Sequence, residues 1–212
     1  MLVNATEMLL KARDGHYGVP QFNINNLEWT KAVLTACEEM KSPVILGVSE
    51  GAGKYMTGFK TVAAMVKAMD ETLGITVPVA LHLDHGTYDQ CYDCIKAGFT
   101  SIMFDGSHYS FKENIEKTKE VVEYAHSKGA VVEAELGKLA GIEDDVNVDV
   151  RNATFTVPEE AAEFVERTGV DSLAIAIGTS HAAYKFKGEP KLDFERLKTI
   201  HKLIPDTPLV LH

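Results

Sequence analysis

The sequence predicts an α/β fold built from repeated strand–helix units, and three observations lead to that prediction. Short apolar runs rich in Val and Ile recur along the 212 residues, and longer segments of helical periodicity separate them. Most of the runs are continuously apolar, which is typical of strands in a parallel sheet that is covered on both faces. Polar and ionisable residues gather where nearly every run ends.

Each apolar run is expected to form one strand. In chain order, the seven predicted strands are residues 17–25, 43–50, 77–85, 101–106, 130–137, 172–178 and 208–212. Five segments between them are expected to form amphipathic helices, at residues 27–40, 87–97, 114–128, 158–168 and 194–203. Pro158 suits the first turn of its helix. Three glycines each follow a predicted helix, where a left-handed cap favours glycine: Gly98, Gly129 and Gly169.

Alternating strands and helices allow two arrangements, an open doubly wound sheet or a (β/α)8 barrel of the TIM type. No Gly-x-Gly-x-x-Gly follows the first strand, so the sequence lacks the motif that best indicates an open, dinucleotide-binding sheet. Barrel active sites assemble from the C-terminal ends of strands, where this sequence places its polar groups, and we therefore expect the TIM barrel. The chain stops at His212, the last residue of the seventh strand. We expect residues 1–212 to form a single barrel domain that ends at strand seven and lacks its C-terminal portion.

The composition excludes several classes of protein. There are 31 acidic and 21 basic residues, a formal charge of −10, which argues against a general nucleic-acid binder. No run of about 18 apolar residues is present, so we expect no membrane span. Charged residues interrupt residues 1–15, which is not the pattern of a signal peptide. The odd number of cysteines, three, fits a reducing cytoplasm.

The sharpest local motif is His82-Leu83-Asp84-His85-Gly86, at the end of the third strand. Strand alternation puts His82 and Asp84 on the same face and leaves His85 at the exit. An acid beside an imidazole there suits a general base next to a metal ligand. An isolated pair is equally compatible with a histidine held by backbone hydrogen bonds beside an acidic helix cap.

Two further histidines end strands six and seven, His181 and His212. Three imidazoles from separate strands, converging with His85 on one mouth, would make a three-histidine site with an open coordination position. That pattern is typical of catalytic zinc.

Other residues add weaker signals. Glu133 and Glu135 share one face of strand five, and Glu143 follows in a segment predicted to be a loop that could close over the mouth. Lys138 is the one strand-end candidate for a Schiff base, and Lys185, four residues after His181, could reach an anionic group. Cys91-x-x-Cys94 lies within a predicted helix without a second cysteine pair, so helix packing is favoured over zinc or redox chemistry.

Several motifs together resemble the class II, zinc-dependent ketose-bisphosphate aldolases. The family contains fructose-1,6-bisphosphate and tagatose-1,6-bisphosphate aldolases, of which the fructose enzyme is favoured here. The resemblance runs from end to end of the chain. It is carried by the segments Phe22–Glu28, Leu81–Gly86, Ser101–His108, Glu133–Gly137 and Gly178–His181.

The resemblance implies a role for each matching residue. His85, His181 and His212 would ligate zinc, with Glu135 contacting the metal when the site rearranges. Asp84 would be the catalytic acid/base, and Glu143 would assist proton transfer. Four positions match contacts to substrate or phosphate: Asn23, Ser49, Ala182 and Lys185. Ala182 stands where the family usually has glycine, and its Cβ could crowd the approach to phosphate.

The implied function is a lyase of glycolysis and gluconeogenesis that reversibly cleaves fructose 1,6-bisphosphate to dihydroxyacetone phosphate and glyceraldehyde 3-phosphate. The resemblance also implies Zn²⁺, a monovalent cation (Na⁺ or K⁺) near the phosphate, and a homodimer or higher homo-oligomer. From the composition we expect a cytoplasmic location without nucleic-acid or membrane partners. The alternatives are a tagatose-1,6-bisphosphate aldolase, another metal-dependent barrel acting on a sugar phosphate, or a non-catalytic barrel fragment acting as a binding protein.

Overall fold

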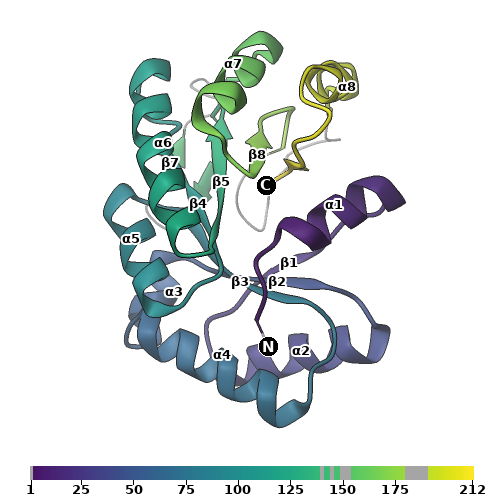
Figure 1. Cartoon of the computed structure of the whole chain (residues 1–212), viewed down its shortest axis with the longest axis vertical. Helices are drawn as coiled ribbons and strands as arrows, with labels where there is room; N and C mark the ends of the chain where they lie inside the picture. The colour runs from purple at the N-terminus through teal and green to yellow at the C-terminus, as the bar shows by residue number, and fades with distance from the viewer. Residues whose placement is uncertain (1, 139–140, 144–145, 149–153, 180–190) are drawn as a thin grey trace. The chain divides into compact units, whose positions relative to one another are not determined.

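The computed structural model describes residues 2–138, 141–143, 146–148, 154–179 and 191–212, and the side chains of 141–143 and 146–148 are not among what it describes. The chain divides into two compact units. The N-terminal unit comprises residues 1–104 and 123–132, and the C-terminal unit comprises residues 105–122 and 133–212. Figure 1 colours both units by residue number, from purple to yellow.

Four parallel strands form the sheet of the N-terminal unit: β1 (Gln21–Asn23), β2 (Val44–Val48), β3 (Val79–Gly86) and β4 (Ser101–Phe104). Its helices are α1 (Thr6–Gly15), α2 (Leu27–Met40), α3 (Glu50–Tyr55), α4 (Phe59–Leu73) and α5 (Tyr88–Ala97). All five residues of β2 are buried, as continuous apolar runs predict for strands covered on both faces.

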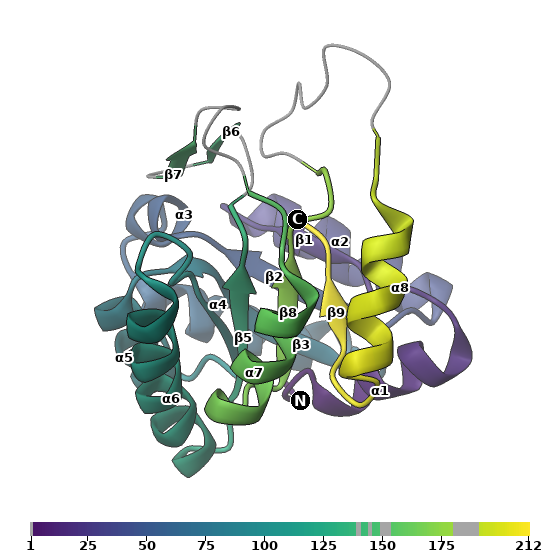
Figure 2. The same cartoon turned by 90° about the horizontal axis from the view of Figure 1, so that it is seen from above.

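Three further strands lie wholly or mostly in the C-terminal unit. Strand β5 (Val131–Leu136) begins in the N-terminal unit, where Val131 N donates to Thr100 O, and it pairs in parallel with β8 (Ser172–Ile175), which pairs with β9 (Leu209–Val210). The seven parallel strands thus follow the order β1-β2-β3-β4-β5-β8-β9. Helices α6 (Phe111–Ser127), α7 (Pro158–Thr168) and α8 (Phe194–Leu203) alternate with strands, and Figure 2 shows β8 beside β9.

The seven predicted strands are all present, with shorter bounds, and α2, α7 and α8 begin and end where the sequence predicted. The three glycine caps are confirmed, with φ of 103° at Gly98, 76° at Gly129 and 68° at Gly169. Helices α1, α3 and α4 were not predicted. The expectation that Glu143 lies in a loop was wrong, because β6 (Gly141–Glu143) and β7 (Val146–Val148) pair as an antiparallel hairpin. That the whole chain forms one barrel domain stays a prediction.

Glu38, on α2, holds the segment that leads into β3. Its carboxylate accepts hydrogen bonds from Thr76 N and Thr76 Oγ1, both at 2.7 Å, and from Val77 N at 3.2 Å, and it pairs with Lys41. The Lys41 ammonium first, and then the Thr76 and Val77 donors, lower the pKa of Glu38 to about 2 from 4.5. Because the folded-state pKa is depressed, the stabilisation is present above pH 4.5 and is lost as the pH falls towards 2.

The Glu38→Gln variant is therefore expected to lose stability at neutral pH and to show a flatter acid dependence than the parent chain. Urea unfolding midpoints measured from neutral pH down through 4.5 would test this. Glu39→Gln, which removes the same charge from the neighbouring exposed position, is the control. Parallel acid profiles for the parent and Glu38→Gln would contradict the assignment.

Candidate active site

The end of β3 carries a backbone distortion at the predicted metal motif. The register between β3 and β4 shifts between Leu83 and Gly86, and His85 adopts the left-handed conformation with φ of 48°. A non-glycine residue there is strained, and bulges beside active sites re-aim side chains. A Cβ on Gly86 would lie 2.9 Å from Met103 O, so the residue after His85 must be glycine. The distortion of β3 therefore lies at Asp84 and His85, the two residues of the predicted site on this strand.

Asp84 is buried, at 2% exposure, and two amides from β1 hold its carboxylate. Gln21 Nε2 donates to Oδ1 at 3.0 Å and Asn23 Nδ2 donates to Oδ2 at 2.8 Å. Each carboxylate oxygen therefore has its own donor, which fixes the plane of the group. A buried carboxylate that is held in one orientation is suited to act as a general base.

The neighbouring His82 has a different partner. Its Nδ1 lies 2.8 Å from Ser101 Oγ on β4, and the imidazole is 1% exposed. The structure therefore separates the two histidines of the motif: His82 belongs to the packed sheet, whereas His85 lies at the distorted strand end.

In the C-terminal unit, His212 and two glutamates share one face of the sheet. Ala174 on β8 is level with both Glu135 on β5 and Val210 on β9, so Glu133, Glu135 and His212 project to the same side. His212 Nε2 lies 2.9 Å from Glu133 Oε1, and Glu133 is 4% exposed. Because Nε2 faces the Glu133 carboxylate, Nδ1 is the ring nitrogen of His212 that can face a ligand.

Five of the described side chains could each serve as a metal ligand. Asp84 and His85 belong to the N-terminal unit, and Asp105, Glu135 and His212 belong to the C-terminal unit. Imidazoles and carboxylates are the ligands that Zn²⁺ takes in catalytic sites, so the donor chemistry fits this metal.

The remaining predicted residues lie at three kinds of place. Ser49 is the N-cap of α3, where its Oγ accepts from Ala52 N at 3.2 Å. Glu143 is in β6, but its side chain lies outside what the structure describes. His181, Ala182 and Lys185 fall in residues 180–190, outside the described ranges.

The cysteine pair of α5 is buried, as the packing interpretation expected. Cys91 and Cys94 are both 0% exposed, and desolvation by burial raises the pKa of each thiol. Such thiols are poor nucleophiles and poor metal ligands.

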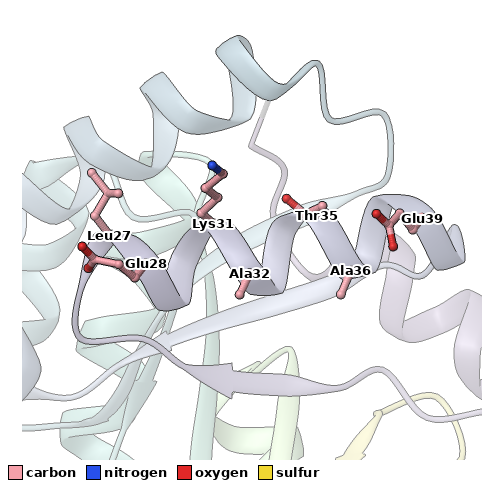
Figure 3. Close-up of a pocket in the computed structure, with 7 residues that line it drawn as sticks. All are labelled: Leu27, Glu28, Lys31, Ala32, Thr35, Ala36 and Glu39. Atoms are coloured by element: carbon pink, nitrogen blue, oxygen red, sulfur yellow. The ribbon is translucent and has the colours of Figure 1, made fainter.

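A shallow groove along α2 offers little chemistry. Figure 3 shows Ala32 and Ala36 pointing to one side of this helix and Lys31 to the other. The lining comes from this single helix: Leu27, Glu28, Lys31, Ala32, Thr35, Ala36 and Glu39. It contains no imidazole, and we place the candidate active site at the strand ends instead.

Sequence reasoning missed Gln21 and the role of Glu133. Period-two alternation is the signal that could have found them. Gln21 shares a strand face with Asn23, and Glu133 shares a strand face with Glu135. Their partners were not predictable from alternation, because the contacts depend on the register between strands.

Comparison with known proteins identifies the family. The family model for class-II fructose-bisphosphate aldolases matches residues 3–212. The chain belongs to this family. The fructose-bisphosphate aldolase of Geobacillus stearothermophilus is 56% identical over 212 residues, which cover 100% of this chain and 72% of the relative. The enzyme of the same name from Thermus caldophilus is 56% identical, with 68% of it covered.

Solved structures agree with the family. The YdjI aldolase from Escherichia coli K12 matches with a TM-score of 0.83 and 38% identity, covering 100% of this aldolase chain and 72% of the other. The predicted fold class, an α/β barrel of the TIM type, is confirmed, as is membership of a family of aldolases. No helix in the described parts of the chain is long and apolar enough to cross a membrane.

Proposed function

We propose that this class-II aldolase reversibly cleaves fructose 1,6-bisphosphate to dihydroxyacetone phosphate and glyceraldehyde 3-phosphate, as the names of its relatives indicate. The observation that carries the proposal is the buried carboxylate of Asp84, held at both oxygens beside His85 at the distorted end of β3. A carboxylate in that state can accept a proton from a bound hydroxyl group.

The proposed step breaks the C3–C4 bond of the sugar. Asp84 accepts the proton of the C4 hydroxyl group, whose oxygen becomes the aldehyde of glyceraldehyde 3-phosphate, while the bonding electrons stay with the three-carbon fragment that carries the ketone. In the condensation direction, Asp84 returns the proton. Glu143 is proposed to assist the proton transfer to that fragment.

Zinc is the proposed cofactor, with His85, His181 and His212 as ligands and Glu135 as an acid that contacts the metal when the site rearranges. When bound, it supplies Lewis acidity that polarises the ketose carbonyl. The hydrogen bond from Nε2 of His212 to Glu133 supports this set, because metal-ligating histidines commonly bind a carboxylate through their other nitrogen. Nδ1 is then the proposed coordinating atom of His212.

Glu133→Ala is expected to weaken zinc binding about 10–100-fold, the usual effect of removing an outer carboxylate that orients a histidine. Competition with a chromogenic chelator measures this without relying on activity. Glu133→Gln, which keeps an acceptor oxygen, should lose less, and Glu159→Ala on the exposed start of α7 is the matched control. Parent-like zinc affinity in Glu133→Ala would remove Glu133 from the metal site.

The experiment that tests the substrate compares fructose 1,6-bisphosphate with tagatose 1,6-bisphosphate, which differ only at the C4 stereocentre. We expect a higher kcat/KM with the fructose substrate, measured through coupled detection of the triose phosphates. Faster cleavage of the tagatose substrate would reverse the assignment. No cleavage of either would favour a binding protein.

Further contacts and conditions belong to the same proposal. Asn23, Ser49, Lys185 and the backbone at Ala182 are proposed to contact the substrate or its phosphates, with a monovalent cation, Na⁺ or K⁺, near one phosphate. The working form is proposed to be a homodimer or a higher homo-oligomer in the cytoplasm. The three free cysteines, none of which forms a disulfide, support the reducing location.

A further inference from the structure

We propose that Gly47 is a positioning residue for the reaction, because its missing side chain leaves the space through which β1 holds Asp84. Gln21 and Asn23, called here the amide clamp, reach across β2 to a carboxylate on β3. The inference rests on the function proposed for Asp84, and it assigns roles to Gly47 and Gln21 beyond those expected from the family.

The register of three strands places these groups on one face. Asn23 is level with Gly47, and Gly47 is level with His82, so Asn23 and His82 flank a position on β2 that carries no side chain of its own. Gln21 and Asp84 lie two residues from these positions, on the same face. Because neighbouring strands are about 4.8 Å apart, β1 and β3 are separated by roughly 10 Å. Direct contact between a side chain on β1 and one on β3 therefore requires a residue without a side chain between them on β2, which is Gly47.

The space at Gly47 is already filled by the clamp. A Cβ built on this residue would lie 2.3 Å from Asn23 Oδ1, 2.9 Å from Gln21 Nε2 and 3.2 Å from Gln21 Cδ. Any other residue at this position would displace both amides.

Backbone conformation does not account for this glycine. The described glycines with positive φ include Gly58, Gly74 and Gly98, and Gly47 is not one of them. An alanine could adopt its backbone angles, and the atoms that it would meet are the ends of flexible side chains. The requirement for glycine at this position therefore comes from the clamp and not from the fold.

The two amides act as one network. Gln21 Nε2 lies 3.5 Å from Asn23 Oδ1 as well as 3.0 Å from Asp84 Oδ1. This contact orients the Asn23 amide so that its Nδ2, and not its oxygen, faces Asp84 Oδ2. Asp84 is thereby held in one rotamer, and a catalytic group misplaced by about 1 Å can cost on the order of 10²-fold in rate.

Two variants test the proposal in the complete chain. Gln21→Met keeps the size of the side chain but removes both of its donated hydrogen bonds, and it should lower kcat on the order of 10-fold with KM little changed. Gly47→Ala, which displaces both amides, should lower kcat by up to about 10²-fold. Both should retain the thermal midpoint of the parent within a few degrees. Gly18→Ala is the matched control, because a Cβ there meets nothing within 4 Å.

Asp84→Asn separates this proposal from the function on which it rests. If the single variant Asp84→Asn keeps full activity, the function proposed for Asp84 fails. If Asp84→Asn is impaired while Gln21→Met and Gly47→Ala are as active as the parent, the clamp alone is overturned. If the clamp acts through Asp84, adding Gly47→Ala to Asp84→Asn should cost little more, whereas fully additive losses would show that Gly47 acts elsewhere. Should Gly47→Ala fold poorly, Gln21→Met and its double variant with Asp84→Asn give the same decision.

Discussion

Removal of the metal is expected to abolish aldol cleavage, and Zn²⁺ or Co²⁺ should restore it. The proposed chemistry places no lysine at the reacting carbonyl, so the carbonyl is left without an electrophile once the metal is gone. The measurement is cleavage of fructose 1,6-bisphosphate after dialysis against a chelator and after titration with each metal. Metal analysis should find one tightly bound Zn²⁺ per chain.

Treatment with borohydride in the presence of substrate is the control for this experiment. A Schiff-base enzyme is trapped and inactivated, whereas the proposed metal enzyme keeps its activity. Activity that resists the chelator but is lost with borohydride would overturn the zinc proposal and direct attention to Lys138, the strand-end lysine of β5.

Asp84→Ala is expected to retain the metal and to lose most of its turnover, because general acid–base groups typically contribute about 10²–10⁴-fold to the rate. The loss should fall on kcat, since the proton is transferred as the C3–C4 bond breaks. Steady-state kinetics together with metal analysis of the same preparation measure both quantities.

Metal content decides between two roles of Asp84. If Asp84→Ala loses zinc in parallel with activity, then Asp84 is a metal ligand or supports one. Thermal unfolding of the variant is a necessary companion measurement, because removal of the carboxylate leaves the Gln21 and Asn23 amides without their acceptor. A folded variant that retains its metal and cleaves at the parent rate would exclude the acid/base role.

The parts of the fold that were predictable are those with strong local signals. Helix α7 begins at Pro158 and ends before Gly169, and both boundaries follow from backbone preferences of these two residues. Helix α3 was missed because Gly51 and Gly53 interrupt its six residues and weaken the helical pattern. The hairpin of β6 and β7 was missed because two three-residue strands are too short to show alternation.

The candidate site was predictable as a set of residues but not as a set of contacts. Asp84 stood out because an acid beside an imidazole at a strand end is chemically suggestive. Its partner Gln21 lies 63 positions earlier, and only the register of three strands brings the two together. Glu133 and His212 are 79 positions apart and meet across β8 for the same reason.

Burial of the cysteines gives the protein an internal reporter of local opening. Cys37, Cys91 and Cys94 all belong to the N-terminal unit, and all three are buried. A thiol-specific reagent can therefore react only when that unit opens. The labelling rate then reports how readily the unit opens under native conditions. No labelling site has to be engineered, and the C-terminal unit, which contains no cysteine, contributes no background. Labelling rates with and without a sugar bisphosphate would show how strongly ligand binding suppresses the opening of the unit that carries Asp84.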